Sequence, residues 1–295
     1  MKRLLIVGCG DIAQRLIPLL QGRCRIYALS RTPQRLAPLR SLGVTPIRGD
    51  LDAPETLGAL AGLAHDVVHL APPPDRGTRD TRTAHLIATL AKGRSLPQQV
   101  VYISTSGVYG DCRGELVAET RPPRPRTERA RRRVDAEQRL REWGRHSGVR
   151  VVILRVPGIY AADRLPVARI ERGTPALAPA EDAFVNHVHA DDLARIVVAA
   201  LYRGGRGRMY HASDDAPIRM GDYFDLVAEH FGLPHPPRVT RAEAESVLSA
   251  QQLSFMNESR RLTNRRLKNE LRMKLRYPTV RHGIAAARAG PPSHG

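Results

Sequence analysis

The first segment of the chain constrains its fold more than any other. An apolar run of strand length, Leu4–Val7, stops at a turn with the pattern Gly-x-Gly-x-x-Ala, and a helical pattern follows at once. The first glycine of such a turn permits a tight bend, and the second lets backbone N–H groups approach a pyrophosphate. The small third residue allows close packing of helix on strand. The sequence therefore predicts a dinucleotide-binding turn at Gly8, Gly10, Asp11, Ile12 and Ala13.

The end of the second predicted strand indicates which dinucleotide is bound. That strand, Arg25–Leu29, is followed by Ser30 and Arg31. An acidic residue here would accept hydrogen bonds from a ribose 2′-hydroxyl and favour NAD, but none is present. The hydroxyl of Ser30 and the guanidinium of Arg31 suit a 2′-phosphate instead, with Arg35 assisting. We predict NADP in preference to NAD mainly from the missing carboxylate, because 43 of the 47 basic residues are arginine and fall at many positions.

Composition narrows the class of partner. A formal net charge of +18 over 295 residues suits phosphate binding, yet the arginines are scattered and aromatic residues make up only 4%. Base-stacking surfaces interleave aromatic and basic side chains, so we predict no specific nucleic-acid partner. Cys9, Cys24 and Cys112 lie far apart without metal-ligand spacing, which indicates a reducing compartment and no metal. No apolar stretch approaches the length of a membrane span. We therefore expect a cytoplasmic monomer or homodimer with a small-molecule substrate and no membrane partner.

Alternating patterns along the chain predict an α/β protein. The sequence predicts strands at 44–51, 66–70, 100–104 and 151–155, and helices at 33–42, 80–92 and 193–202, with two or three more between 220 and 275. Dense apolar runs in several strands fit a parallel sheet covered on both faces. Pro46 predicts a short or edge strand, and His69, inside an apolar run, is interpreted as a core residue. Asp191 and Asp192 are expected to cap the helix that follows them.

Several motifs beyond the glycine turn carry a family resemblance. They are Tyr-Ile-Ser-Thr-Ser-Gly-Val-Tyr-Gly at 102–110, Glu137 on the next helix, Arg-Val-Pro-Gly-Ile-Tyr at 155–160, His-Val-His-Ala-Asp-Asp at 187–192 and Leu-Arg-Tyr-Pro-Thr at 275–279. With them the chain resembles, over nearly its whole length, the extended short-chain dehydrogenase/reductases, nearest to their NAD-dependent epimerase/dehydratase-like group. The resemblance implies a Rossmann-type doubly wound parallel sheet with a small C-terminal substrate lobe.

The resemblance also implies boundaries and residue roles. It places a dinucleotide-binding domain at 1–158 that also receives 184–203, a substrate lobe at 159–183 and 204–285, and a disordered tail at 286–295. The residues implied to line or flank the cofactor are Asp50 and Leu51 beside the adenine, Ala71, Pro72, Ser104, and Pro157, whose backbone meets the nicotinamide amide. Thr105 matches the catalytic Ser/Thr of the family, whose hydroxyl hydrogen-bonds the reacting oxygen of the substrate.

The chain departs from the family at the catalytic Tyr-x-x-x-Lys. Alignment on Glu137 puts Arg129 at the Tyr position and Arg133 at the Lys position, and the three residues share one helical face. In the family the Tyr transfers the proton, and the Lys lowers the pKa of that Tyr and binds the nicotinamide ribose. Arg133 can keep the ribose and electrostatic roles, but the guanidinium of Arg129 stays protonated and cannot exchange a proton near neutral pH. Tyr109 is our first choice for the missing acid/base, ahead of Asp111, His189 and Tyr160.

Two functions are open from the sequence. The first is an NAD(P)-dependent oxidoreductase, epimerase or dehydratase whose substrate is small and either anionic or of the nucleotide-sugar type. Four arginines would suit such a substrate, Arg129, Arg133, Arg155 and Arg164. The alternative is an NADP(H)-binding redox sensor or regulatory protein without turnover. The missing Tyr and Lys favour the sensor, while the glycine turn and Thr105 fit both functions.

Overall fold

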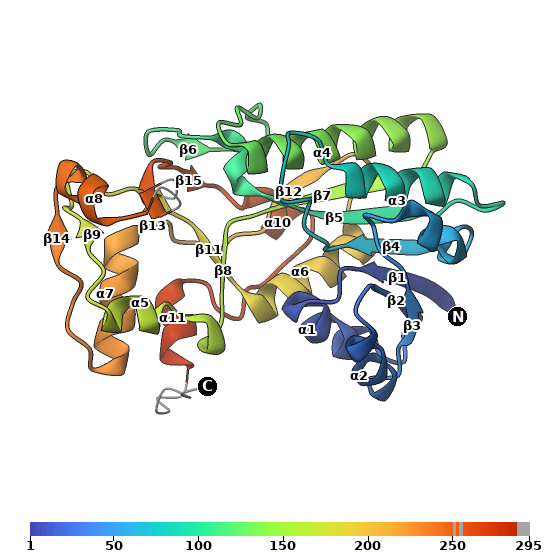
Figure 1. Ribbon diagram of the computed structural model, residues 1–295, viewed down its shortest axis with the longest axis horizontal. Helices are drawn as coiled ribbons and strands as arrows, with labels where there is room; N and C mark the ends of the chain where they lie inside the picture. Colours follow the sequence, from blue (N-terminus) through green and yellow to red (C-terminus); the bar gives the residue numbers. More distant parts are fainter. Residues whose placement is uncertain (250–251, 254–255, 288–295) are drawn as a thin grey trace.

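The computed structural model describes residues 1–249, 252–253 and 256–287. Its centre is a seven-stranded sheet in the order β12-β7-β5-β4-β1-β2-β3 (Figure 1), and every pair of neighbouring strands is parallel. The strands are β1 (Lys2–Val7), β2 (Cys24–Ser30), β3 (Thr45–Arg48), β4 (Asp66–His69), β5 (Gln99–Thr105), β7 (Arg150–Val156) and β12 (Met209–His211). This arrangement confirms the predicted Rossmann-type α/β fold.

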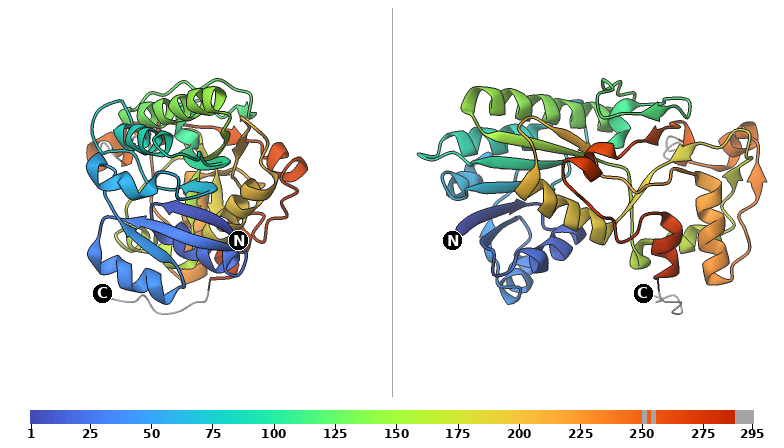
Figure 2. Two further views of the ribbon diagram at one scale, coloured as in Figure 1. Left: turned by 90° about the vertical axis from the view of Figure 1, so that its right-hand side faces the viewer. Right: turned by 180° about the vertical axis from the view of Figure 1, so that it is seen from behind.

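Helices cover both faces of the sheet (Figure 1 and Figure 2). One face carries α1 (Asp11–Leu20), α2 (Leu36–Ser41) and α6 (Ala190–Arg203), and the other carries α3 (Thr81–Ala91) and α4 (Glu128–Ser147). Side chains alternate along a strand, so β1 contributes Leu4 and Ile6 to the first layer and Leu5 and Val7 to the second. Within the described part of the chain, no helix is both long and apolar enough to cross a bilayer.

Two expectations from local sequence hold in the structure, and two do not. Pro46 lies in β3 at the edge of the sheet, as predicted. His69 is a core residue, 1% exposed, with its Nε2 3.0 Å from Thr83 Oγ1, and burial lowers its pKa to about 3. The expected caps of α6 are wrong, because the side chain of His189 accepts the N–H of Asp191 and the helix begins at Ala190. The short strand β12 was not predicted.

The remaining elements lie beside the sheet or build the end of the molecule beyond it (Figure 1). They are η2 (Pro54–Leu60), η3 (Ser106–Tyr109), β6 (Leu116–Val117), β8 (Gly158–Tyr160), η4 (Ala162–Arg164), α5 (Val167–Glu171), β9 (Ala176–Leu177), β10 (Phe184–Val185), β11 (His187–His189), β13 (Ile218–Arg219), α7 (Met220–Phe231), β14 (Arg238–Val239), α8 (Arg241–Val247), β15 (Arg261–Leu262), α10 (Arg265–Asn269) and α11 (Val280–Ala285). A 3-10 turn, η1 (Pro33–Arg35), precedes α2. A separate apolar cluster joins α5, α7 and α11 through Ile170, Phe224, Val227 and Ile284.

The segment expected to form the C-terminal lobe returns in part to the sheet. Residues 204–285 include β12, which is the edge strand next to β7, and Leu267 and Leu271, which pack in the same core as α1 and α6. The sequence did not predict this strand because β12 has only three residues and follows a segment, 204–208, made of glycine and arginine. Of the predicted tail at 286–295, residues 288–295 lie outside the described part of the chain.

A buried ion pair holds α4 against the sheet. Glu137 on α4 accepts hydrogen bonds from Arg155 on β7, at 3.0 Å from Nε and 2.7 Å from Nη2, and from the hydroxyl of Ser104 on β5 at 2.5 Å. The side chains of Glu137 and Arg155 are only 3% and 4% exposed. The guanidinium of Arg155 also lies 4.7 Å from the centre of the Tyr109 ring. These contacts fix α4 in register with β5 and β7.

We predict that Arg155→Met lowers the free energy of unfolding by about 3–5 kcal/mol, because it leaves the carboxylate of Glu137 buried without its counter-ion. Chemical denaturation of both proteins measures the difference. The matched control is Arg139→Met, which removes a partly exposed i,i+4 pair with Asp135 on the same helix and should cost about 0.5 kcal/mol. A loss from Arg155→Met no larger than that of the control would contradict the structural role of the buried pair.

Candidate functional site

A cavity of about 470 Å³ lies at the carboxyl ends of β1–β4. This edge is where open parallel sheets bind ligands. Twelve of the residues predicted to bind the cofactor line it together: Gly8, Gly10, Asp11, Ile12, Ala13, Ser30, Arg31, Arg35, Asp50, Leu51, Ala71 and Pro72. The sequence-derived set therefore converges on one space from four separate loops.

The glycine turn gives this cavity the shape of a phosphate cradle. Gly8 has φ +98°, and a Cβ there would lie 2.4 Å from the backbone nitrogen of Ala71, so only glycine fits between β1 and β4. A Cβ on Gly10 would meet nothing within 4 Å and would project beside the start of α1, which has no side-chain cap. The free N–H groups of this helix end and its dipole suit a pyrophosphate, so the residues present fit a dinucleotide.

Cations line the far end of the same cavity. Ser30 ends β2 and is buried, whereas Arg31 and Arg35 are exposed on the rim. Arg35 donates from Nη1 to the carbonyl of Cys9 at 3.1 Å and so lies across the glycine turn. Arg82, which the sequence analysis missed, donates to Asp52 from Nε at 2.8 Å and from Nη2 at 2.6 Å and also lines the cavity. No carboxylate stands at the end of β2 itself.

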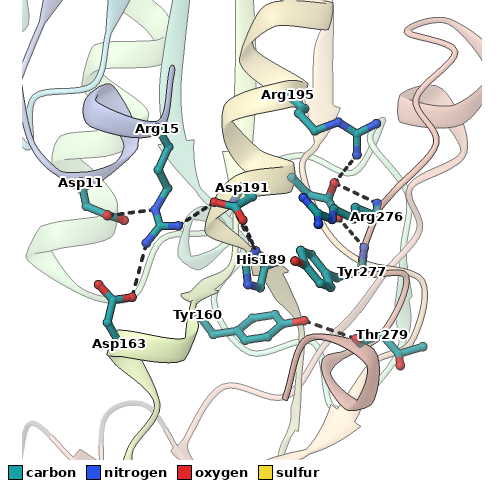
Figure 3. Close-up of polar contacts among 11 residues, drawn as sticks. Asp11, Arg15, Tyr160, Asp163, His189, Asp191, Arg195, Arg276, Tyr277 and Thr279 are labelled. Atoms are coloured by element: carbon teal, nitrogen blue, oxygen red, sulfur yellow. Dashed lines mark hydrogen bonds and ion pairs between the residues drawn. The ribbon is translucent and has the colours of Figure 1, made fainter. Parts of the chain in front are cut away.

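An ion-pair network neutralises the one acidic residue of the turn (Figure 3). Arg15 donates to Asp11 at 2.9 Å, to Asp191 at 2.6 Å and to Asp163 at 3.3 Å, so it links α1 to α6 and η4. Arg164 donates to the other oxygen of Asp11 at 3.1 Å. Both oxygens of Asp11 are thus engaged by guanidinium groups. The carboxylate therefore presents less negative charge to an anion at the start of α1.

A second cavity, of about 740 Å³, opens beside the first. The two cavities share Pro72 and Arg133 in their walls. The second cavity is lined from the sheet side by Thr105 and Pro157, from α4 by Arg129 and Arg133, and from the far end of the molecule by Phe184, Asn186, His187, Met220, Tyr223, Phe224, Glu258 and Arg260. The predicted catalytic Thr105, Arg129 and Arg133 thus lie in one space that adjoins the proposed cofactor cavity.

Arg133 is held at the junction of the two cavities by contacts to β5. Its Nη1 donates to the carbonyl of Ile103 at 2.8 Å and to the hydroxyl of Tyr102 at 3.1 Å. These bonds use one nitrogen of the guanidinium, which carries several N–H donors. Thr105 caps η3 by accepting the N–H of Gly107 at 3.2 Å. In that contact the hydroxyl of Thr105 only accepts, so its hydrogen can be donated to a substrate.

Tyr109 is not in either cavity, which corrects its prediction as the acid/base. It is 2% exposed, and its hydroxyl lies 2.5 Å from Nε2 of His211 on β12. The Nδ1 of His211 is 2.8 Å from the carbonyl of Thr263, and a carbonyl only accepts, so Nδ1 carries the hydrogen and Nε2 accepts from Tyr109. Burial raises the pKa of Tyr109 to about 12. Tyr109 is therefore a structural residue.

Three further sequence interpretations are corrected by the geometry. Ser104 lines neither cavity, because its side chain points into the core toward Glu137. Arg155 is buried in the same contact and is not accessible to a substrate. Arg164 lines the first cavity rather than the second. Alternation of side chains along β5 and β7 explains the first two, since neighbouring residues point to opposite faces.

Several cavity residues escaped the sequence analysis. Arg132 is 6% exposed, lines the second cavity and donates to the carbonyl of Gly77 at 2.5 Å. Arg260 pairs with Glu258 at 2.8 Å, and both also line this cavity. The sequence offered no signal for these residues beyond the general abundance of arginine.

Comparison with known proteins relates the chain to NAD(P)H-binding proteins. The model of a family described as NAD(P)H-binding matches residues 8–203. A functionally unknown conserved protein from Silicibacter pomeroyi DSS is 30% identical, with a TM-score of 0.79 over 97% of this chain and 98% of that one. A dTDP-glucose 4,6-dehydratase from Bacillus anthracis str. Ames in complex with NAD has a TM-score of 0.77 at 15% identity, over 96% and 94% of the two chains.

A curated relative from Stigmatella aurantiaca, 4-hydroxy-2-methyl-3-oxo-4-farnesyl-3,4-dihydroquinoline-1-oxide ketoreductase, is 24% identical over 250 residues, which are 79% of this chain and 74% of that protein. Because the family model covers most of the chain, the protein belongs to the NAD(P)H-binding family. The dehydratase from Bacillus anthracis and two solved epimerases, which are 15–16% identical to this chain, share its fold.

We predict that Tyr109→Phe destabilises the protein by about 1–3 kcal/mol without weakening NADPH binding, because it leaves the buried Nε2 of His211 unpaired and touches neither cavity. Denaturation and a fluorescence titration with NADPH measure the two effects. The control is Tyr202→Phe, since Tyr202 is 57% exposed and the change should alter stability by less than about 0.5 kcal/mol. A tenfold loss of NADPH affinity in folded Tyr109→Phe would restore Tyr109 to the site.

Proposed function

We propose that this protein is an NADP(H)-dependent oxidoreductase that binds the dinucleotide in the first cavity and a small anionic substrate in the second. The observation that carries the proposal is the shared wall: Arg133 and Pro72 border both cavities. A nicotinamide placed at that junction would face Thr105 and Pro157. The proposal assigns dinucleotide binding to the segments that build the sheet and substrate contacts to α7 and to the loops around Asn186 and Arg260.

Different residues of the first cavity would bind different parts of the dinucleotide. Gly8, Gly10 and the start of α1 receive the pyrophosphate, Asp50 and Leu51 border the adenine, and Arg31 and Arg35 pair with a 2′-phosphate. When bound, the cofactor would supply or accept a hydride. Arg133 would donate to the nicotinamide ribose and place positive charge beside any oxygen that gains negative charge during reaction.

The second cavity supports an anionic substrate. Its walls contain four arginines and only two carboxylates. The arginines are Arg129, Arg132, Arg133 and Arg260, and the carboxylates are Asp75 and Glu258. A guanidinium binds carboxylate or phosphate with two parallel hydrogen bonds and keeps its charge at all physiological pH values. Thr105 would donate its hydroxyl to the reacting oxygen of the substrate. Reduction of a carbonyl is the reaction class that we favour, in keeping with the ketoreductase named above.

The alternative function, a redox sensor that binds NADP(H) without turnover, is favoured by one specific observation. In an alignment on Glu137, Arg129 and Arg133 take the positions of the proton-transferring Tyr and the Lys of the family that the chain resembles. The two functions differ in one measurement. An enzyme consumes NADPH in the presence of a carbonyl compound that carries a carboxylate or phosphate. A sensor binds NADPH but consumes none.

We predict that NADPH binds about tenfold to over a hundredfold more tightly than NADH, because one charge-assisted contact to the 2′-phosphate contributes about 1.5–3 kcal/mol. Calorimetric titrations with both cofactors give the ratio. Arg31→Asp should reverse the preference, whereas Arg40→Asp, an exposed arginine on α2 that does not line the cavity, should leave it unchanged. Equal affinities for the two cofactors, or tighter binding of NADH, would refute the assignment of NADP.

A further inference from the structure

The second cavity contains a buried tyrosine that the sequence analysis did not single out. Tyr223 on α7 lines the cavity and is 7% exposed. Among the described residues, its hydroxyl has no hydrogen-bond partner. His187, which also lines the cavity and is 7% exposed, has an unpartnered Nδ1. Tyr223 therefore offers the second cavity a hydroxyl that no described protein group occupies.

Strand pairing brings this wall to the proposed reaction site. The register of β5 against β7 places Thr105 opposite Val156, the residue directly before Pro157. Thr105 and Pro157 both line the second cavity. The end of β5 and the end of β7 therefore present adjacent residues to the cavity.

The next strand pair extends the wall from Pro157 to Tyr223. β8 and β11 place Gly158 opposite His187. A Cβ on Gly158 would lie 3.1 Å from Cδ2 of His187, so glycine leaves room for the imidazole at this point. The His187 ring in turn packs on the Tyr223 ring, with centroids 4.3 Å apart and planes 35° from parallel. A continuous series of contacts thus connects Thr105 to Tyr223.

Two other buried tyrosines near the sheet, Tyr160 and Tyr102, have their hydroxyls engaged elsewhere. The hydroxyl of Tyr160 donates to the carbonyl of Thr279 at 3.3 Å (Figure 3), and that of Tyr102 accepts from Arg133. Neither lines the second cavity. Tyr223 is therefore the tyrosine whose hydroxyl is available in the second cavity, within the described residues.

The surroundings of Tyr223 keep its proton in place at neutral pH. Burial raises the pKa of Tyr223 above its usual value. Burial likewise lowers the pKa of the adjacent His187 to about 4, so that the imidazole is neutral. At neutral pH Tyr223 is therefore protonated, which is the state that a proton donor needs when a carbonyl is reduced.

Resting on the proposed function, we propose that Tyr223 donates the proton when a carbonyl compound is reduced in the second cavity. The carbonyl carbon gains a hydride from the reduced nicotinamide dinucleotide, and the π bond of the carbonyl breaks toward oxygen. That oxygen takes the proton of Tyr223 as the O–H bond of the tyrosine breaks. Water then returns a proton to the tyrosinate. The carbonyl compound is reduced to an alcohol, and the dinucleotide is the two-electron reductant.

The test uses para-carboxybenzaldehyde, which combines a carbonyl with the carboxylate expected to meet the arginines, and follows consumption of NADPH. Tyr223→Phe keeps the ring that packs on His187 and removes only the hydroxyl. It should lower kcat by about 10²- to 10⁴-fold while the Kd for NADPH stays unchanged. The Kd of the product, para-carboxybenzyl alcohol, should rise by about 2- to 12-fold, as expected for the loss of one neutral hydrogen bond. Tyr202→Phe, at an exposed position outside the second cavity, is the matched control and should match the native protein.

Each other outcome identifies which claim fails. Folded Tyr223→Phe with a kcat within about threefold of native would overturn the proposal, as would a large loss in Glu258→Gln with none in Tyr223→Phe. A native protein that binds NADPH but reduces no probe would also overturn the role of Tyr223, while the cofactor site would stand. Failure to bind NADPH at all would instead refute the proposed function.

Discussion

The position of α4 depends on the buried carboxylate of Glu137. This group accepts three hydrogen bonds from Arg155 and Ser104, so it ties the helix to two neighbouring strands at once. Residues four and eight positions earlier lie on the same helical face, and these are Arg133 and Arg129. The ion pair in the core therefore determines which side chains of α4 reach the cavities. Its geometry also explains why Arg155 and Ser104 are structural rather than substrate-binding residues.

The cations presented by α4 change what the site can do. A Tyr and Lys in these positions would provide a group that exchanges its proton near neutral pH. Guanidinium groups keep their protons, so Arg129 and Arg133 can bind and orient anions and stabilise developing negative charge but cannot act as acid or base. We propose that positive charge comes from the arginines of α4 and that the exchangeable proton comes from Tyr223 on α7.

Sequence reasoning succeeded where the signal was local. The glycine turn, the end of β2 and the loop at Ala71 each follow a strand directly, and parallel pairing brings such loops to one edge of the sheet. It failed at Tyr109, because the 3-10 turn after β5 directs that side chain away from the cavity and onto His211. It also missed Tyr223, which lines the same cavity as Thr105 only because strands and helices far apart in the chain pack together. No spacing rule within the sequence could predict that approach.

The central claim is that the two cavities meet at Arg133 and form one reaction site. A crystal structure of the protein with NADPH tests it most directly. The account predicts the pyrophosphate at Gly10 and the start of α1, the 2′-phosphate beside Arg31, and the nicotinamide ring between Arg133 and Pro157, facing the cavity that holds Thr105 and Tyr223. A nicotinamide ring directed away from this second cavity, or a dinucleotide bound outside the glycine turn, would contradict it.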